Sequence, residues 1–234
     1  MTEAAFPPGL TPAGARALQQ RLADRVVARD GVGQVRWVAG LDVHYPQKDT
    51  AHAVAALLRY PELTVAAVAE VDLPVTFPYV PGLLSFREAP AAVAALEALP
   101  HRPDLVFADG QGYAHPRRFG LACHLGVWLN LPVIGAAKSR LIGESDGPPD
   151  VAGAWSPLLD KGEVIGAVLR TRAGVKPLYV SVGHRVDLAA AIRWTLACCR
   201  GYRLPEPSRW AHRIAGGGKA PAGALAAASP GAVG

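Results

Sequence analysis

The chain has little of what would mark a membrane or secreted protein. It has three cysteines in 234 residues. Cys198 and Cys199 are adjacent and Cys123 stands alone, which gives neither a disulfide framework nor a metal-ligand spacing. No run of about 18 uninterrupted apolar residues exists to span a membrane. The N-terminus has an acid and prolines where a signal peptide has a basic start and an apolar block. We therefore expect a soluble, cytoplasmic protein.

Length and charge limit the domain organisation and the class of partner. Half of the residues are apolar, enough for one substantial core, and a chain of this length favours one domain. A net charge of +5 and a pI near 9.3 are compatible with a nucleic-acid partner without requiring one. After Arg213 the sequence is rich in glycine, alanine and proline and has no periodicity. We expect one domain over residues 1–213 and a disordered tail over 214–234.

The periodicity of the apolar residues predicts an α/β fold with one mixed sheet and helices on its faces. Strands are expected over 35–45, 51–59, 63–73, 104–108, 131–135, 163–170 and 177–183. Helices are expected over 12–29, 89–99, 117–129 and from 187 to about 199. The first three strands follow one another closely and predict an antiparallel meander. The next two strands alternate with helices and predict parallel pairing.

The stretch over residues 104–116 stands out because a short apolar run stops there at a carboxylate. Asp109 ends the run and is followed by Gly110, Gly112 and His115. An open α/β sheet binds ligands at the carboxyl ends of its strands, and glycines allow close backbone approach. Asp-Gly also makes ordinary turns, so this stretch alone does not decide between a site and a turn.

Two more acids lie beside apolar runs. Asp42 lies within the first expected strand, and Glu88 lies at the junction between a proline-rich loop and a helix. Unpaired ionised carboxylates are costly in such places, so converging acids commonly share a cation. Mg²⁺ prefers oxygen ligands, and on a phosphodiester it can activate water and stabilise the leaving oxygen. Asp42, Glu88 and Asp109 are therefore candidate metal ligands.

Both of the added acids also have a purely structural interpretation. Glu88 with Ser85 matches a capping box, although Pro90 favours a helix start nearer residue 88. Asp42 could pair with an arginine. The sequence leaves these alternatives open.

The basic candidates and the glycine motifs are similarly ambiguous. His115 precedes Pro116 and could simply begin a helix, and Lys138 could point either to solvent or to a phosphate. Residues 137–139 lack the glycine spacing of a P-loop, and residues 110–112 lack the third glycine of a dinucleotide fingerprint. Both nucleotide-binding motifs are therefore rejected.

Three stretches together resemble the endonuclease V family. They are VAGLDV over 38–43, PYVPGLLSFRE over 78–88 and DGQG over 109–112. Residues 135–139 and 202–209 extend the resemblance, which covers about residues 10–213 in the family's order. It implies a ribonuclease H-like fold and a Mg²⁺-dependent DNA repair endonuclease, with Mn²⁺ as a substitute ion. The implied substrate is deoxyinosine, cut at the second phosphodiester on its 3′ side to leave 3′-hydroxyl and 5′-phosphate ends.

The resemblance also implies roles for single residues. The candidate catalytic residues are Asp42, Glu88, Asp109, His115 and Lys138, of which the three acids would hold metal and the other two would assist at the scissile phosphate. Tyr79, between Pro78 and Pro81, resembles a wedge that fills the space left by a base that leaves the stack. The implied base pocket comprises Gly82, Leu84, Gly110, Gly120, Leu121 and Leu141.

Two histidines are accessory candidates. His212 resembles a histidine that lies near the metals in some family members. His44 lies on the same strand face as Asp42, at a position where many members carry serine.

Two other functions stay open at this point. One is a nuclease of the same fold that acts mainly on inosine-containing single-stranded RNA, because the sequence does not show how 2′-hydroxyls are handled. The other is a non-catalytic nucleic-acid-binding protein, against which the intact acids argue. We expect a monomer that binds DNA and no membrane.

Overall fold

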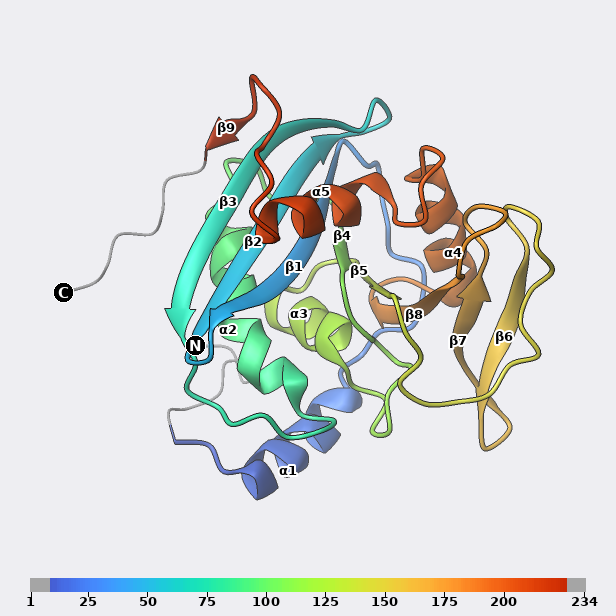
Figure 1. Ribbon diagram of the computed structural model, residues 1–234. Coiled ribbons are helices and arrows are strands. Elements are labelled where there is room, and N and C mark those ends of the chain that lie inside the picture. The colour runs from blue at the N-terminus through green and yellow to red at the C-terminus, as the bar shows by residue number, and fades with distance from the viewer. Residues whose placement is uncertain (1–8, 227–234) are drawn as a thin grey trace.

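Over residues 9–226, the part of the chain that the structure describes, a computed structural model shows one mixed sheet flanked by helices (Figure 1). The nine strands lie in the order β6-β7-β8-β5-β4-β1-β2-β3-β9. They are β1 (Trp37–Gln47), β2 (Thr50–Arg59), β3 (Thr64–Pro74), β4 (Leu105–Ala108), β5 (Val133–Ala137), β6 (Trp155–Asp160), β7 (Glu163–Leu169), β8 (Leu178–His184) and β9 (Leu225–Ala226). The helices are α1 (Pro12–Ala23), α2 (Leu84–Glu97), α3 (Leu121–Leu129), α4 (Leu188–Ala197) and α5 (Glu206–Ala215).

The sheet combines an antiparallel and a parallel half. Strands β1, β2 and β3 form the expected meander, and β4 pairs in parallel with both β1 and β5. Strand β8 then pairs antiparallel with β5 and with β7, so β7 and β8, which match the strands expected over 163–170 and 177–183, form a hairpin. The predicted fold class is confirmed.

Helices cover both faces of the sheet because strand side chains alternate between the faces. Leu41 and Val106 belong to the apolar layer under α2 and α3. Val38 and Phe107 belong to the opposite layer, which includes residues of α4 and α5. Helix α1 packs outside this arrangement, against the loop and helix residues around Phe86. The carboxyl ends of β1 and β4 therefore lie between helical layers.

Three helix boundaries differ from the sequence-based expectation. Helix α1 ends at Ala23, where Asp24 is the C-cap, and not at residue 29. Helix α2 begins at Leu84 with Pro90 inside it, and its N-cap has no side-chain hydrogen bond, so the capping box is wrong. Helix α3 begins at Leu121 and not at residue 117, because Arg118 has a left-handed φ of 53° that no helix accommodates.

Three elements were not predicted, namely β6, α5 and β9. Strand β6 contains Pro157, which argues against an interior strand but is tolerated here because β6 lies at the sheet edge. Helix α5 begins with a proline pair around Glu206, and proline in the first turn is compatible with a helix.

The C-terminal segment is partly placed by the structure. Helix α5 runs through Ala215, and β9 pairs in parallel with β3. The expected domain boundary at residue 213 thus falls inside a helix, and residues 227–234 of the expected tail lie outside the described residues. Within residues 9–226, no helix has both the length and the apolar character needed to cross a membrane.

Candidate active site

Two of the predicted acids are neighbours on adjacent parallel strands. Leu41 of β1 pairs in register with Ala108 of β4, so Asp42 and Asp109 follow side by side. The backbone N–H of Asp109 donates to the Leu41 carbonyl oxygen at 3.1 Å and extends the ladder by one residue. The strand pairing itself therefore brings both carboxylates to one edge of the sheet.

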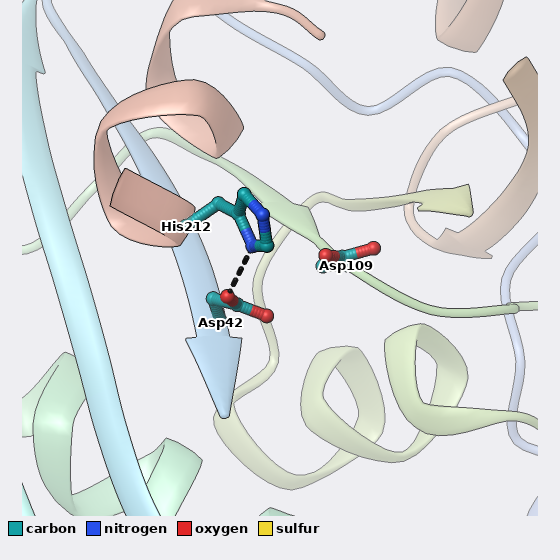
Figure 2. Close-up of side chains that lie close together, drawn as sticks. All are labelled: Asp42, Asp109 and His212. Carbon is teal, nitrogen blue, oxygen red and sulfur yellow. Dashed lines mark hydrogen bonds and ion pairs between the residues drawn. The ribbon is translucent and has the colours of Figure 1, made fainter. Parts of the chain in front are cut away.

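A histidine from the other end of the chain joins them. The Nδ1 atom of His212 on α5 lies 2.8 Å from Asp42 Oδ2 (Figure 2). Asp42, Asp109 and His212 each offer one ligand atom within 4.8 Å of the others. Carboxylate oxygens and an imidazole nitrogen form a donor set that suits a divalent cation. The expectation that His212 lies near the acids agrees with this arrangement.

A glycine lets α5 come this close to the sheet. A side chain at Gly40 of β1 would collide with the backbone carbonyl of Pro207, near the start of α5. The absence of that side chain allows the helix to pack directly on β1. His212 is thereby carried to the carboxyl end of the strand.

Lys138 lies within this group and not in open solvent. It follows β5, and its ammonium contacts Asp109 Oδ2 and lies 3.0 Å from His212 Nδ1. Burial raises the pKa of Asp109, and the charge of Lys138 opposes that rise. An arginine partner for Asp42, the structural alternative, is not found in the described part of the chain.

Glu88 lies one turn into α2, apart from the close group of three. Its side chain is 7% exposed, and the hydroxyl of Tyr45 donates to Oε1 at 3.4 Å. Burial raises the pKa of Glu88 to about 8, and the charges of Asp42 and Asp109 act in the same direction. Without a cation nearby, this carboxyl is therefore protonated at neutral pH. Glu88 therefore lies near enough to both aspartates for their charges to act on its carboxyl group.

A cavity of about 400 Å³ opens beside the acids. All six residues of the implied base pocket line it, namely Gly82, Leu84, Gly110, Gly120, Leu121 and Leu141. Six of the other candidates line it as well, namely Tyr79, Pro81, Glu88, Asp109, His115 and Lys138. Its volume lies in the range of sites that hold small molecules or single groups of larger ones. The residues of the implied base pocket and two of the three acids, Glu88 and Asp109, thus line the same cavity.

The loop before α2 presents its aromatic residue outward. Tyr79 lines the cavity and its side chain is 70% exposed, which is unusual for a ring of that size. Pro78 and Pro81 on either side restrict the backbone of the loop. The ring is therefore presented at the cavity mouth at low conformational cost.

The two remaining histidine candidates differ in their surroundings. His115 is buried, its Nε2 lies 3.1 Å from the Gly82 carbonyl oxygen, and its Nδ1 accepts from the N–H of Arg117 at 3.2 Å. Burial, together with the charge of Arg117, lowers the pKa of His115 to about 4. His44 is exposed and pairs across from His52 of β2, outside the group around Asp42.

Comparison with known proteins places the chain in a family. The sequence model of the family described as Endonuclease V matches residues 20–213, which is most of the chain. The chain belongs to the endonuclease V family. A curated endonuclease V from Roseiflexus sp. (strain RS-1) is 53% identical over 209 residues, which cover 89% of this chain and 94% of the relative. The resemblance seen in the sequence is thereby confirmed.

Solved endonuclease V structures have the same fold. The crystal structure of endonuclease V from Streptomyces avermitilis has a TM-score of 0.85 at 46% identity, with 91% of this chain and 93% of that chain covered. Endonuclease V from Ciona intestinalis, in complex with a 24mer DNA containing an inosine followed by a ribo-adenosine, has a TM-score of 0.76 at 27% identity. That match covers 88% of this chain and 95% of that chain.

In this endonuclease V family member, sequence reasoning overlooked several residues at the site. Gln111 lines the cavity, and its Nε2 donates to the carbonyl oxygen of Ser139 at 2.8 Å, which joins two cavity walls. It stands between two glycines that were noted, and that position was a usable signal. Tyr45 was overlooked because its partner Glu88 lies 43 residues away, and no pattern within β1 shows that the two side chains meet.

Proposed function

We propose that this protein is a DNA repair endonuclease that recognises deoxyinosine. It hydrolyses the second phosphodiester bond on the 3′ side of the lesion and leaves 3′-hydroxyl and 5′-phosphate ends. The main support for this proposal is that Asp42, Asp109 and His212 lie together beside a cavity. The Ciona relative, whose structure holds inosine-containing DNA, supports the choice of substrate.

Mg²⁺ is the ion proposed for this site, with Mn²⁺ as a substitute. The donor set fits, because Asp42 and Asp109 are mostly buried, adjacent and of like charge, a combination that a cation relieves. Glu88 and His212 complete the set of residues that would hold it. When bound, the ion would supply activation of the attacking water and stabilisation of the leaving oxygen.

Basic side chains beside the acids would assist at the phosphate and at the base. The ammonium of Lys138 lies at the acids and can donate to a phosphate oxygen, because it carries three N–H groups on a flexible stem. We include His115 in the proposed site as a residue beside the base. His44 is retained as an accessory candidate only through its place on the same strand.

Base recognition would rest largely on fixed backbone. Hypoxanthine presents a carbonyl and a ring N–H where adenine presents an amine and an acceptor, so fixed donors and acceptors can separate them. Three glycines of the cavity wall, Gly82, Gly110 and Gly120, let backbone approach a base closely. Inosine also pairs weakly with thymine, which lowers the cost of removing it from the stack.

A same-fold ribonuclease is the second candidate, and one observation favours it. The DNA bound to the Ciona relative carries a ribonucleotide directly after the inosine. A 2′-hydroxyl at that position is what would distinguish RNA from DNA.

The test is a strand-cleavage assay with products mapped to single-nucleotide resolution. Matched oligonucleotides carry deoxyinosine, inosine or deoxyadenosine at one position, with Mg²⁺ or with EDTA. We expect the deoxyinosine strand to be cut at the second phosphodiester on its 3′ side, and EDTA to prevent cutting. Cleavage of the RNA strand alone would exclude the deoxyribonuclease proposal in favour of the second candidate.

Replacing Tyr79 by alanine is expected to weaken binding to deoxyinosine DNA. An aromatic ring stacked on a base contributes about 1–3 kcal/mol, so the dissociation constant should rise roughly 5- to 150-fold. Fluorescence anisotropy with a labelled oligonucleotide measures this, and Tyr79→Phe is the control that keeps the ring. A parallel loss of metal affinity would show that the loop acts on the acids and not on the base.

A further inference from the structure

The carbonyl oxygen of Gly82 receives an unusual number of hydrogen bonds. Its donors are Gln19 Nε2 at 3.2 Å, His115 Nε2 at 3.1 Å and Arg117 Nη2 at 2.6 Å. A carbonyl oxygen has two lone pairs, so three donors saturate it. Gly82 therefore contributes to the cavity by its position and its small size, and its carbonyl has no capacity left for a ligand.

Gln19 of α1, one of the three donors, also binds two other groups. Its side chain is 0% exposed, and its Nε2 also donates to the Phe119 carbonyl oxygen at 2.6 Å. Its Oε1 accepts from Nε of Arg117. Loss of this buried amide would leave several polar groups without partners, which costs more than the bonds themselves. Gln19 lies just before the residues matched by the family model, and no motif contains it.

His115 is committed to the same network through both ring nitrogens. Because Nδ1 accepts from the Arg117 N–H, the proton is on Nε2, which donates to Gly82. The low pKa of this ring, about 4, agrees with a neutral imidazole. A ring bound in this way has no free nitrogen for a phosphate.

The backbone conformation at Gly82 favours glycine. Its φ is +77°, and a Cβ atom there would lie 2.8 Å from Arg117 Nη2. Just beyond it, the Leu83 N–H donates to the Val80 carbonyl oxygen at 2.9 Å and closes a turn. Fixing Gly82 therefore fixes both the loop that carries Tyr79 and the start of α2 that carries Glu88.

We propose that Gln19, His115 and Arg117 are positioning residues that clamp the Gly82 carbonyl and so hold the 79–84 wall of the cavity where a lesion base needs it. The clamp replaces the direct phosphate contact that the family resemblance implied for His115. Its effect on lesion binding rests on the proposed function, whereas the clamp itself does not. Because these residues act on the base wall, they set the affinity for the lesion more than the rate of the chemical step.

The first experiment needs no nucleic acid. Hydrogen–deuterium exchange is measured for wild type, Gln19→Leu and the matched control Gln20→Leu, whose glutamine is exposed on the same helix. We expect backbone amides over 80–86 to exchange at least about tenfold faster in Gln19→Leu, with β1 and β4 unchanged and the control like wild type. Wild-type exchange over 80–86 in a folded Gln19→Leu protein would overturn the clamp. If Gln19→Leu does not fold, Arg117→Met, which loses one clamp donor at a half-buried position, gives the same readout.

The second experiment uses deoxyinosine DNA and separates the two proposals. We expect KM to rise roughly tenfold in Gln19→Leu while kcat stays within about twofold. His115→Asn should keep the shape of the wild-type pH–rate profile, whereas loss of a limb of that profile would show acid–base catalysis by His115 and overturn its positioning role. If wild type does not cut deoxyinosine DNA, the proposed function fails and the exchange result still decides the clamp. If wild type cuts it and the substitution lowers kcat at constant KM, the clamp's role in recognition fails.

Discussion

Asp109→Asn is expected to lower the cleavage rate of deoxyinosine DNA by at least roughly a thousandfold, because a residue that holds a catalytic metal supports several kcal/mol of transition-state stabilisation. Asparagine keeps the shape of the side chain and the backbone bond to Leu41. It removes the charge that faces Lys138 and lies beside Asp42. The loss should therefore be chemical and not structural. Single-turnover cleavage at saturating enzyme measures it.

The control for this experiment is another aspartate of the same chain. Asp146 is exposed and stands apart from the acids of the site, so Asp146→Asn should cut at the wild-type rate. Calorimetric titration with Mn²⁺ should show at least about tenfold weaker metal binding for Asp109→Asn alone. Wild-type cleavage by a folded Asp109→Asn protein would remove the proposed catalytic centre altogether.

Glu88→Gln is expected to stabilise the metal-free protein while it impairs cleavage. The folded pKa of Glu88 is about 8, against 4.5 for an unperturbed glutamate. Between these values the folded chain keeps a proton that the unfolded chain releases, so the free energy of unfolding falls as the pH rises. Glutamine does not ionise and avoids this loss. The variant's advantage should grow from pH 4.5 to 8 and reach roughly 5 kcal/mol.

Chemical denaturation in EDTA at several pH values measures this difference. Glu97→Gln, an exposed position of the same helix, is the matched control and should show no such pH-dependent gain. A wild-type protein as stable at pH 8 as Glu88→Gln would contradict the raised pKa. The rate of DNA cleavage with Mg²⁺ should fall in Glu88→Gln, because the neutral amide is a poorer ligand for the proposed ion than the carboxylate.

The sequence predicted those parts of the site that depend on local pattern. Period-two alternation and an apolar run that ends in an acid were sufficient to place Asp42 and Asp109 on strands whose ends meet. The predicted start of α2 was wrong because Pro90 was interpreted as a residue of the first helical turn. In the structure Pro90 lies inside the helix, where tertiary packing tolerates it. Local patterns are sufficient where one strand or its end decides the geometry.

Other parts depend on contacts between distant segments. The bonds from Gln19 to Gly82 and to Phe119 join positions 63 and 100 residues apart. No local pattern encodes that distance, and a glutamine on a helix is by default a surface residue. The position of α5 also depends on a distant segment, because the helix packs where Gly40 of β1 has no side chain.

The packing of α5 on Gly40 also bears on when the site forms during synthesis. Strand β1 ends 159 residues before α5 begins, β4 ends 98 residues before it, and α5 is the last helix in the described part of the chain. During synthesis the acids can therefore pair long before the histidine leaves the ribosome. On the proposed function, a nascent chain that has not yet released α5 holds the two carboxylates without His212, and we expect cleavage only after α5 has packed on β1.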